Sequence, residues 1–384
     1  MRVLCVDHGA LLRGYRDRYV AMARLDPDLE LTVVAPRGLR DLNYIGQWDP
    51  PDAGETGYRL VFTSFRPAKV HRGVFGPFSV ARLLRELRPD VVQTQGEPEA
   101  LSSGVLCALR DALAPASRFA FVSWSNLDVC ALGWPYRLPF LYDWSYRYVL
   151  RHGDAATVYC APAEGILRAN GFAGRIAPVP WGVDPDTFRR MPVDELRASL
   201  GLRGLVLGFV GRLEPAKGVA TLVRAAARCG VECGLLVVGG GPAQGELEAL
   251  ARELGVPARF VGRVGNSDLP RYLNCMDALV LPSETTRYWK EQFGKVLIEA
   301  MACEVPVIGS DSGEIPHVMG EAGLVFREKD ADDLAARIAA LADPAARAER
   351  ARLGRARAVR EYSWESVARL TLAFYRDLLR GPGA

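Results

Sequence analysis

The chain has 384 residues, a length that suits two domains of roughly 150–200 residues with a hydrophobic core in each. Hydrophobic residues make up 49% of the chain and charged residues 24%, which excludes a disordered or collagen-like protein. Its 48 basic and 45 acidic residues give a net charge of +3, so no overall positive field draws it to nucleic acid. We therefore expect a globular protein without a nucleic-acid partner.

Basic residues concentrate in one stretch of the first half. Seven basic residues and one acidic residue lie between Arg59 and Arg88, which gives this stretch a local charge of +6. Such a stretch would suit an anionic acceptor or the surface of a membrane.

The cysteines and the amino terminus indicate a reducing compartment. The eight cysteines are scattered, mostly inside apolar runs, without a C-x-x-C pair or a histidine at zinc-ligand spacing. The chain opens on an apolar strand at MRVLCV and not on a signal peptide, and no segment reaches about 18 uninterrupted apolar residues. We expect a cytoplasmic protein with reduced core cysteines, at most peripheral at the inner membrane face.

The first half alternates short apolar runs with helical patterns. Such alternation predicts a parallel α/β sheet with helices on both faces. Strands are expected at Val3–Val6, Leu31–Ala35, Asp90–Thr94 and Phe119–Ser123, and helices near Arg16–Ala23 and Leu101–Leu113.

The second half repeats the alternation and predicts a second α/β sheet. Its expected strands are Leu205–Val210, Leu235–Val238, Arg259–Val261, Ala278–Leu281, Val305–Ile308 and Gly323–Phe326. Its expected helices are Val219–Cys229, Gly245–Leu254, Leu269–Cys275 and Val296–Ala302.

The junction between the two halves and the last helices can also be predicted. Prolines, glycine and aspartate interrupt regular structure at PVPWGVDPDTF, residues 178–188, which makes this segment a candidate hinge. Asp343–Arg360 is rich in alanine and arginine and predicts an exposed helix. A final amphipathic helix needs an apolar surface to dock on. Its apolar positions are Trp364, Val367, Leu370, Thr371, Phe374, Tyr375 and Leu378.

Four segments of the second half carry candidate chemistry, and the first is Gly211–Gly218. This segment follows an apolar strand and opens a helix, so it lies at the carboxyl edge of a parallel sheet, where α/β folds bind ligands. Arg212 and Lys217 would each place a cation on a diphosphate there. The alternative is an ordinary loop whose basic side chains are solvated.

The second segment is the glycine run Gly239–Gly241, which allows a ligand to approach the backbone or makes a tight turn. It does not match G-x-G-x-x-G, and no acidic residue ends the next strand where a ribose site requires one. The pattern therefore disfavours a nicotinamide-dependent dehydrogenase.

The third segment contains two glutamates eight residues apart. A helix that starts near Phe293 or Gly294 would point free N–H groups at an anion. Glu291 lies before this start and Glu299 about two turns into the helix, inside an apolar run where an unpaired charge is costly. The two carboxylates would bracket a ligand, or they belong to a surface helix whose acidic first turn satisfies its dipole.

The fourth segment, Pro306–His317, is a strand that ends in a loop of small residues and would shape the nucleotide side of a site. His317 has no partner in view and is assigned a structural or solvent-exposed role.

Together these segments resemble the carboxyl-terminal domain of family 4 glycosyltransferases, which are retaining enzymes of the GT-B architecture. The resemblance rests on the strand-G-R-x-x-x-x-K-G segment, the glutamates around F-G, E-A-M-A-C-x-V-P-V-I and S-G-E-I-P, in this order over some 170 residues. It implies two Rossmann-like, doubly wound parallel-sheet domains that face each other across a cleft. Residues 1–182 would bind the acceptor, residues 183–362 would bind the nucleotide sugar, and residues 363–384 would form a helix that crosses back to the first domain.

The first half resembles the family less strongly. It does so through Val6–Gly9 followed by Tyr15-Arg16, Asp90–Gln93, and Gly182–Asp184. Many members carry a histidine over the donor sugar where this chain reads Ser123-Trp124-Ser125-Asn126, which looks like a W-x-N subgroup. Asn126 would supply a neutral hydrogen bond or simply form a turn. Glu304 also departs from the family, which commonly has glycine at that position.

The resemblance implies transfer of a hexosyl unit from a UDP- or GDP-sugar to an acceptor, with retention at the anomeric carbon. No bound cofactor and no metal are expected. The catalytic set would be Arg212, Lys217, Glu291 and Asn126. The donor-binding set would be Gly9, Gly211, Gly240, Arg263, Val264, Phe293, Gly294, Lys295, Val296 and Glu299. The two domains are expected to close over the donor.

Alternatives stay open. A sugar-nucleotide epimerase of the same architecture needs an acid/base cluster that the sequence does not assemble. A pyridoxal phosphate phosphorylase needs a Schiff-base lysine in a much longer chain. A non-catalytic nucleotide-sugar-binding protein would keep the same motifs without turnover. The aromatic segment Trp134–Trp144 would touch a lipid interface or, as the favoured interpretation, pack in the amino-terminal core.

Overall fold

The structure, a computed structural model, describes the whole chain except residues 39–50, 52–53, 68–71, 126–127, 129–137 and 381–384. The described chain divides into two compact units. The first comprises Met1–Pro180 together with Trp364–Ala384, and the second comprises Trp181–Ser363.

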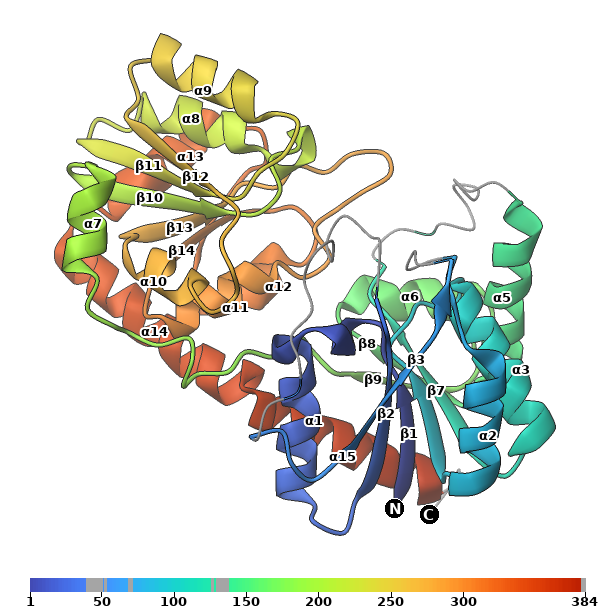
Figure 1. Ribbon diagram of the computed structural model, residues 1–384. Coiled ribbons are helices and arrows are strands. Elements are labelled where there is room, and N and C mark those ends of the chain that lie inside the picture. Colours follow the sequence, from blue (N-terminus) through green and yellow to red (C-terminus); the bar gives the residue numbers. More distant parts are fainter. Residues whose placement is uncertain (39–50, 52–53, 68–71, 126–127, 129–137, 381–384) are drawn as a thin grey trace. The chain divides into compact units, whose positions relative to one another are not determined.

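A seven-stranded parallel sheet forms the centre of the first unit (Figure 1). Its strands run in the order β3-β2-β1-β6-β7-β8-β9. They are β1 (Arg2–Val6), β2 (Glu30–Pro36), β3 (Arg59–Thr63), β6 (Val91–Thr94), β7 (Arg118–Ser123), β8 (Ala155–Val158) and β9 (Arg175–Pro178). A short antiparallel pair, β4 (Phe65–Arg66) and β5 (Val74–Phe75), stands apart from this sheet.

Helices cover both faces of the first sheet because its central strands are apolar on both sides. Along β1, Leu4 and Val6 enter one core cluster, whereas Val3 and Cys5 enter the other. The first cluster also holds residues of α2 (Pro77–Leu87), α3 (Leu101–Leu113), α5 (Pro139–His152) and α6 (Ala161–Ala169). The second holds residues of α1 (Arg13–Leu25) and α15 (Trp364–Arg380). A 3-10 turn, η1 (Gly9–Leu11), links β1 to α1.

The second unit contains a six-stranded parallel sheet in the order β12-β11-β10-β13-β14-β15 (Figure 1). Its strands are β10 (Leu205–Val210), β11 (Cys233–Val238), β12 (Ala258–Gly262), β13 (Ala278–Leu281), β14 (Val307–Ser310) and β15 (Leu324–Phe326). Its α-helices are α7 (Asp194–Leu200), α8 (Val219–Ala226), α9 (Gln244–Glu253), α10 (Leu269–Asn274), α11 (Lys295–Ala302), α12 (Ile315–Met319), α13 (Ala331–Ala340) and α14 (Pro344–Tyr362). The 3-10 turns are η2 (Pro215–Lys217) and η3 (Gly320–Ala322).

The two sheets confirm the predicted fold class, which is α/β with two doubly wound parallel sheets. In each unit the first strand lies in the middle of the sheet, with the next two strands on one side and the later strands on the other. This order creates a switch point beside the first strand of each sheet, between β1 and β6 and between β10 and β13.

Helix α14 is not the fully exposed helix that its composition predicts. Gly354, Ala358 and Tyr362 are buried along one side of it, and it packs against α11. A Cβ atom on Gly354 would lie 3.1 Å from Met301 Cγ, so the small residues allow the two helices to approach closely. Arg355 on α14 donates to the Ala302 carbonyl at 2.6 Å at the end of α11. One side of α14 is therefore a packing face, whereas most of its alanines are exposed or half-buried as predicted.

Helix α15 docks on α1, but one of its predicted apolar contacts is wrong. Leu370 is 44% exposed, whereas Leu372 is buried. The buried positions recur every three or four residues, which is one face of an α-helix, and Leu370 falls outside this face. They are Trp364, Val367, Ala368, Thr371, Leu372, Phe374, Tyr375 and Leu378.

Glu304 has a left-handed backbone conformation, with φ of +59°, in the turn after α11. A side chain with a Cβ atom is strained in this conformation and glycine is not. We therefore expect Glu304→Gly to stabilise the second unit by about 0.5–1 kcal/mol, after the higher entropy of unfolded glycine is subtracted. Urea unfolding measures this change.

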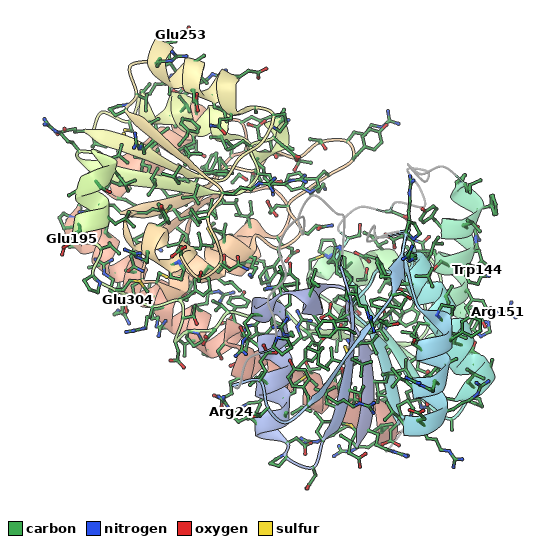
Figure 2. All side chains as sticks on the ribbon, viewed as in Figure 1. Arg24, Trp144, Arg151, Glu195, Glu253 and Glu304 are labelled. Atoms are coloured by element: carbon green, nitrogen blue, oxygen red, sulfur yellow. The ribbon has the colours of Figure 1, made fainter. Side chains whose placement is uncertain are left out.

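Glu253 provides the matched control for Glu304, since both are exposed glutamates of the second unit (Figure 2). Because Glu253 ends helix α9 without a left-handed backbone conformation, Glu253→Gly should give no stabilisation. If both substitutions destabilise equally, the turn at Glu304 is not strained.

The cysteines of the described chain are all buried and free of disulfides. They are Cys5, Cys107, Cys160, Cys229, Cys233, Cys275 and Cys303, while Cys130 lies outside the described residues. Within the same described ranges, no helix is both long and apolar enough to cross a membrane.

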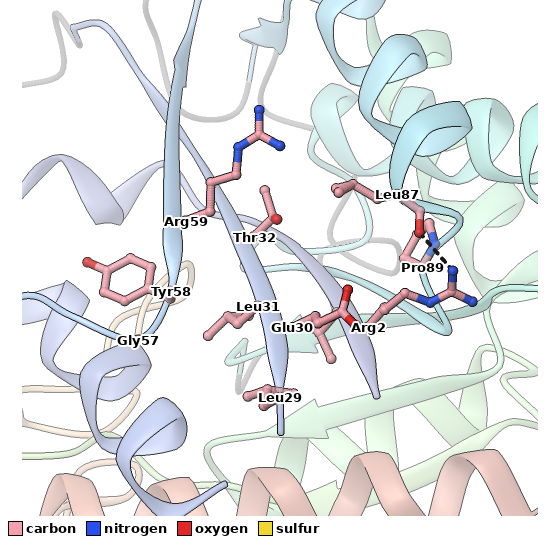
Figure 3. A pocket seen from close by; sticks show the side chains of 11 residues that line it. Arg2, Leu29, Glu30, Leu31, Thr32, Gly57, Tyr58, Arg59, Leu87 and Pro89 are labelled. Carbon is pink, nitrogen blue, oxygen red and sulfur yellow. Dashed lines mark hydrogen bonds between the residues drawn. The ribbon is translucent and has the colours of Figure 1, made fainter. Parts of the chain in front are cut away.

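A pocket lies at the amino ends of β1, β2 and β3 (Figure 3). Arg2 reaches from β1 to the Leu87 carbonyl at 3.2 Å and to Asp90 at 3.3 Å, so its guanidinium already has partners. Ligands of doubly wound sheets bind at the carboxyl ends of the strands. The functional site is therefore expected at the opposite edge of each sheet.

Candidate functional site

The carboxyl edge at the switch point of the second sheet carries most of the predicted site residues. Strands β10 and β13 are neighbours there, and the loops that follow them are Gly211–Gly218 and Pro282–Gly294. The next strands lie on opposite sides of this pair, which is the position where doubly wound sheets bind ligands.

Glycine holds the two loops against each other. Gly218 has a φ of +66°, and a Cβ atom at this position would lie 1.8 Å from the Pro282 carbonyl oxygen. The Glu284 N–H donates to the Ala216 carbonyl at 2.8 Å, which fixes the register of the loops. Any side chain at residue 218 would force the loops apart.

Lys217 and Glu291 form the centre of this edge. Lys217 Nζ lies 2.7 Å from Glu291 Oε2, and the Ser283 hydroxyl donates to the same oxygen at 2.7 Å. The lysine ammonium also lies 4.3 Å from the centre of the Trp289 ring, within the range of a cation–π contact. Glu291 is buried and Lys217 half-buried, so the pair is shielded from water more than a surface ion pair.

This ion pair was not predicted from the sequence. The motifs predict a diphosphate contact for Lys217 and a place in the catalytic set for Glu291, and the structure joins the two residues directly. An ammonium has three N–H donors, so Lys217 retains donors for a second partner while it holds Glu291.

Arg212 lies on the same loop and is exposed. Its guanidinium forms a 2.6 Å ion pair with Glu214, two residues along the chain. Gly211, the residue before it, donates to the Val238 carbonyl at 3.0 Å and so ties this loop to the end of β11.

The glycine run after β11 brings Gly240 beside Arg263. A Cβ atom built on Gly240 would have Arg263 Cγ as its nearest neighbour, at 4.0 Å, so open space adjoins this backbone. The backbone at Gly239 is crowded instead, because a Cβ atom there would lie 1.9 Å from the Gly211 carbonyl oxygen. Arg263 is exposed and Val264 half-buried in the loop after β12.

Helix α11 begins at Lys295, and Gly294 before it has a φ of +77°. The first turn of the helix, which includes Val296, therefore directs backbone N–H groups toward the carboxyl edge of the sheet. Phe293 is buried and packs edge-on against Tyr362, with ring centres 5.8 Å apart.

Glu299 is buried one turn further along α11 and has a partner. Lys295 Nζ lies 2.8 Å from Glu299 Oε1. A buried charge without a partner would be costly, but Glu299 pairs with Lys295, four residues earlier on the same helix. The burial of Glu299 therefore does not by itself indicate a ligand. Glu291 and Glu299 each have their own lysine.

The loop after β14 completes this edge. The Ser310 hydroxyl donates to the Ser283 carbonyl at 2.5 Å, and the Glu314 N–H donates to the Glu291 carbonyl at 3.1 Å. Burial raises the pKa of Glu314, and nearby His317 acts in the opposite direction. The pattern S-G-E-I-P indicated this loop, but Glu314 was not among the predicted site residues.

Gly9 is the predicted site residue of the first unit that the structure describes. Its N–H donates to Asp7 Oδ1 at 2.7 Å, and the Tyr19 hydroxyl donates to Asp7 Oδ2 at 2.7 Å. A Cβ atom on Gly9 would lie 2.4 Å from Tyr15 Cδ1, so only glycine fits beside that ring. Asn126 lies outside the described residues.

Two buried carboxylates at the same edge of the first sheet were missed. Glu97 and Glu99 follow β6 and are 3% and 7% exposed. The two acids flank Pro98 in the loop after a buried strand, and this pattern could have indicated a site. It was missed because the same pattern is typical of an exposed polar loop.

The aromatic segment before and within α5 is divided between core and surface. Tyr142 is buried as the favoured interpretation requires, but Phe140 is 64% and Trp144 41% exposed. Trp144 and Arg151 project outward from α5 (Figure 2). Residues 134–137 of this segment lie outside the described residues.

Glu99 makes the stability of the chain depend on pH. Burial raises its pKa from 4.5 to about 7, so between these values the folded chain holds a proton that the unfolded chain releases. The contribution of Glu99 to the free energy of unfolding is therefore fully present below 4.5, the pKa in the unfolded chain, and is lost as the pH rises through about 7. The free energy of unfolding of Glu99→Gln minus that of the parent should therefore be higher at about pH 8 than at about pH 5, by on the order of 2 kcal/mol.

Urea unfolding of the parent and Glu99→Gln at the two pH values tests this expectation. Glu86→Gln, at an exposed position of α2, is the control and should show the same stability difference from the parent at both. If the stability difference between Glu99→Gln and the parent is the same at both pH values, the pKa of Glu99 is not raised in the folded chain.

Two doubly wound parallel sheets in one chain are the arrangement of the GT-B fold. Solved structures share the fold over almost the whole chain. Sucrose-phosphate synthase from Thermosynechococcus elongatus aligns with a TM-score of 0.72 at 23% identity, covering 99% of this chain and 100% of its own. Anabaena HepE in complex with UDP aligns with a TM-score of 0.74 at 18% identity, covering 98% and 100%.

Family models match both units. The Glycosyl transferase 4-like domain matches residues 16–182, and Glycosyl transferases group 1 matches residues 204–343. Together these two matches cover most of the chain, and both describe glycosyl transferase domains.

Curated relatives are similar over part of their length. D-inositol 3-phosphate glycosyltransferase of Mycobacterium marinum is 35% identical over 217 residues, which is 53% of this chain and 45% of the relative. The 2-deoxystreptamine glucosyltransferase of Streptomyces kanamyceticus is 32% identical over 248 residues, 61% of this chain and 63% of the relative. The chain spans about half the length of several curated relatives that it matches.

Proposed function

We propose that this chain transfers a hexosyl unit from a nucleoside diphosphate sugar to an acceptor, with retention of the anomeric configuration. The observation that carries this proposal is the Lys217–Glu291 pair, which spans the two loops at the switch point of the second sheet. UDP- and GDP-sugars are the donors to test first. HepE, which shares the fold, was solved with UDP, and this supports the choice of UDP as a probe.

The proposed roles follow from the placement of the cations. The leaving group is a nucleoside diphosphate, so catalysis requires stabilisation of negative charge as the glycosidic bond breaks. Lys217 and Arg212 lie on the loop after β10, and the first turn of α11 directs N–H groups to the same edge. We assign the diphosphate to these groups and assign no covalent nucleophile.

The remaining predicted residues would position the donor. Glu299 would accept from the ribose hydroxyls and Glu291 from hydroxyls of the sugar, while the backbone near Arg263 and Val264 would contact the base. Gly240 would let the ligand approach the backbone, since open space adjoins it. We propose that these groups act without a metal.

Incubation with radiolabelled sugar nucleotides tests the proposal. Slow release of free nucleoside diphosphate and labelled sugar, without an added acceptor, is expected for a transferase that binds its donor productively. Conversion of the donor into its epimer without release of diphosphate would instead show an epimerase. Donor binding without any turnover, in the presence of a broad acceptor panel, would show a binding protein.

The two glutamates should differ in their effects on binding and turnover. Glu299→Gln should mainly weaken UDP binding, roughly tenfold, because an amide keeps an acceptor but loses the charge. Glu291→Gln should mainly lower kcat, because the carboxylate beside Lys217 is proposed to contact the sugar and not the nucleotide. Calorimetric titration with UDP and steady-state kinetics separate the two effects, and the reverse pattern would invert the assignment.

We propose that the protein acts in the cytoplasm with peripheral contact to a membrane through α5. Exposed Phe140 and Trp144 lie on this helix together with Arg147 and Arg151, which suits an interface of anionic lipid. Sedimentation with vesicles of anionic lipid, compared with neutral vesicles, tests this contact.

A further inference from the structure

Trp289 lies on the loop after β13 and is a contact of Lys217 to which the proposed function gives no role. The centre of its ring is 4.3 Å from Lys217 Nζ, and the residue is half-buried. An ammonium over the face of an aromatic ring is attracted to it, and tryptophan attracts a cation more strongly than tyrosine or phenylalanine. This contact joins the loop after β10 to the loop after β13, as the Lys217–Glu291 pair does.

A tight turn holds Trp289 in this position. The Thr286 N–H donates to the Trp289 carbonyl at 2.8 Å, and the Thr286 hydroxyl donates to the same carbonyl at 3.3 Å. The Tyr288 N–H donates to the Thr286 hydroxyl at 3.3 Å. The Tyr288 side chain is 67% exposed and lies beside the Arg287 guanidinium, 5.3 Å from its ring centre. Of these two adjacent aromatic residues, Trp289 is therefore the one that contacts Lys217.

Glu291 holds the ammonium from a second side and is itself fixed. The Ser283 hydroxyl donates to Glu291 Oε2 at 2.7 Å, and the Ser310 hydroxyl donates to the Ser283 carbonyl at 2.5 Å. Among the described residues, Lys217 Nζ donates its hydrogen bond to Glu291. An ammonium with one N–H on a carboxylate and a second against a ring face has a third N–H for a ligand. The two contacts set the direction of this third N–H, although the lysine stem is flexible.

We infer that Trp289 is a positioning residue for Lys217, whose remaining N–H it helps to present to the diphosphate of the donor. The inference rests on the proposed function, which assigns the diphosphate to Lys217. Trp289 acts through the lysine and not by contact with the ligand. A lysine that is already ordered loses less side-chain freedom when the ligand binds. Loss of the ring should therefore weaken nucleotide binding.

Substitutions at Trp289 test whether an aromatic face is needed. Calorimetric titrations of the full chain with UDP and GDP identify the nucleotide that binds more tightly, which is then used for all variants. Trp289→Leu should weaken this binding roughly fivefold to tenfold. Trp289→Phe keeps a ring face and should weaken it by less than about threefold. Equal losses in the two variants would show that the ring face does not matter, which would overturn the inference.

Tyr288→Leu is the matched control, because it removes the neighbouring exposed aromatic side chain from the same turn. This variant should bind the nucleotide like the parent. A loss as large as that of Trp289→Leu would mean that the turn as a whole, and not the ring over Lys217, supports binding. That result would also contradict the positioning role.

A double-mutant cycle tests whether Trp289 acts through Lys217. In a chain that already carries Lys217→Ala, Trp289→Leu should change nucleotide affinity by less than about twofold, because the ring has no ammonium left to hold. If the losses of the two single variants multiply in the double variant, Trp289 contacts the ligand itself, for example by stacking on the base. The positioning role would then be wrong.

The parent and Lys217→Ala keep the two proposals apart. A parent that binds neither UDP nor GDP contradicts both, since Lys217 would have no diphosphate to receive. Affinity that is unchanged in Lys217→Ala also contradicts both, because it removes the lysine from the diphosphate site. Affinity that falls in Lys217→Ala but not in Trp289→Leu contradicts the positioning role and leaves the donor proposal intact.

Discussion

Lys217→Ala is expected to weaken UDP binding roughly tenfold to a hundredfold and to lower turnover by at least as much. A charge-assisted hydrogen bond to phosphate contributes about 1.5–3 kcal/mol, and Lys217 holds its ammonium at the switch point of the second sheet. Arg212→Ala should weaken binding less, because this side chain is exposed and already pairs with Glu214 at 2.6 Å. Calorimetric titration with UDP measures both effects.

The Lys217 variant needs two controls because it also leaves Glu291 buried without its cation. Arg224→Ala removes an exposed cation of α8 in the same unit and should bind UDP like the parent. The double variant Lys217→Ala and Glu291→Gln also removes the unpaired negative charge of Glu291. Its free energy of unfolding should therefore return toward that of the parent, while UDP binding stays weak. If the single variant binds UDP like the parent, the diphosphate site is not at this loop.

The strands at the switch point of the second sheet could be predicted from the sequence because they are short runs of mostly apolar residues. Leu205–Val210 and Ala278–Leu281 agree with the observed β10 and β13. Helix α6 was not predicted because Pro162 and Gly165 suggest a loop, yet proline is well tolerated in the first turn of a helix. Strand β8 was not predicted either, although all four of its residues are buried, because it begins with two alanines and not with large apolar residues.

The pairing of site residues was harder to predict than the residues themselves. Motif order identified Lys217 and Glu291, but their contact joins positions 74 residues apart and depends on which strands are neighbours. The Lys295–Glu299 pair could have been predicted, since residues four apart on a helix face each other. Glu97 and Glu99 were missed because sequence alone does not report the burial of a polar loop.

Removal of α15 should prevent the first unit from folding stably. The helix contributes Ala368, Leu372, Phe374, Tyr375 and Leu378 to one of the two core clusters of that unit. Each fully buried large side chain contributes about 1.5–3 kcal/mol, so their sum is comparable to the net stability of a domain. Deletion from Ser363 onward should give insoluble protein or a chain that unfolds at much lower urea concentration than the parent.

Two leucines on α15 make this test independent of whether the truncated chain can be purified. Leu372 is buried and Leu370 is 44% exposed, although they are only two residues apart on the same helix. Leu372→Ala should therefore cost about 2–5 kcal/mol in the free energy of unfolding, whereas Leu370→Ala should change it by less than about 0.5 kcal/mol. Urea unfolding of the two variants compares them directly. Equal effects, or a soluble truncation as stable as the parent, would mean that α15 is a dispensable tail and that the core of the first unit is complete without it.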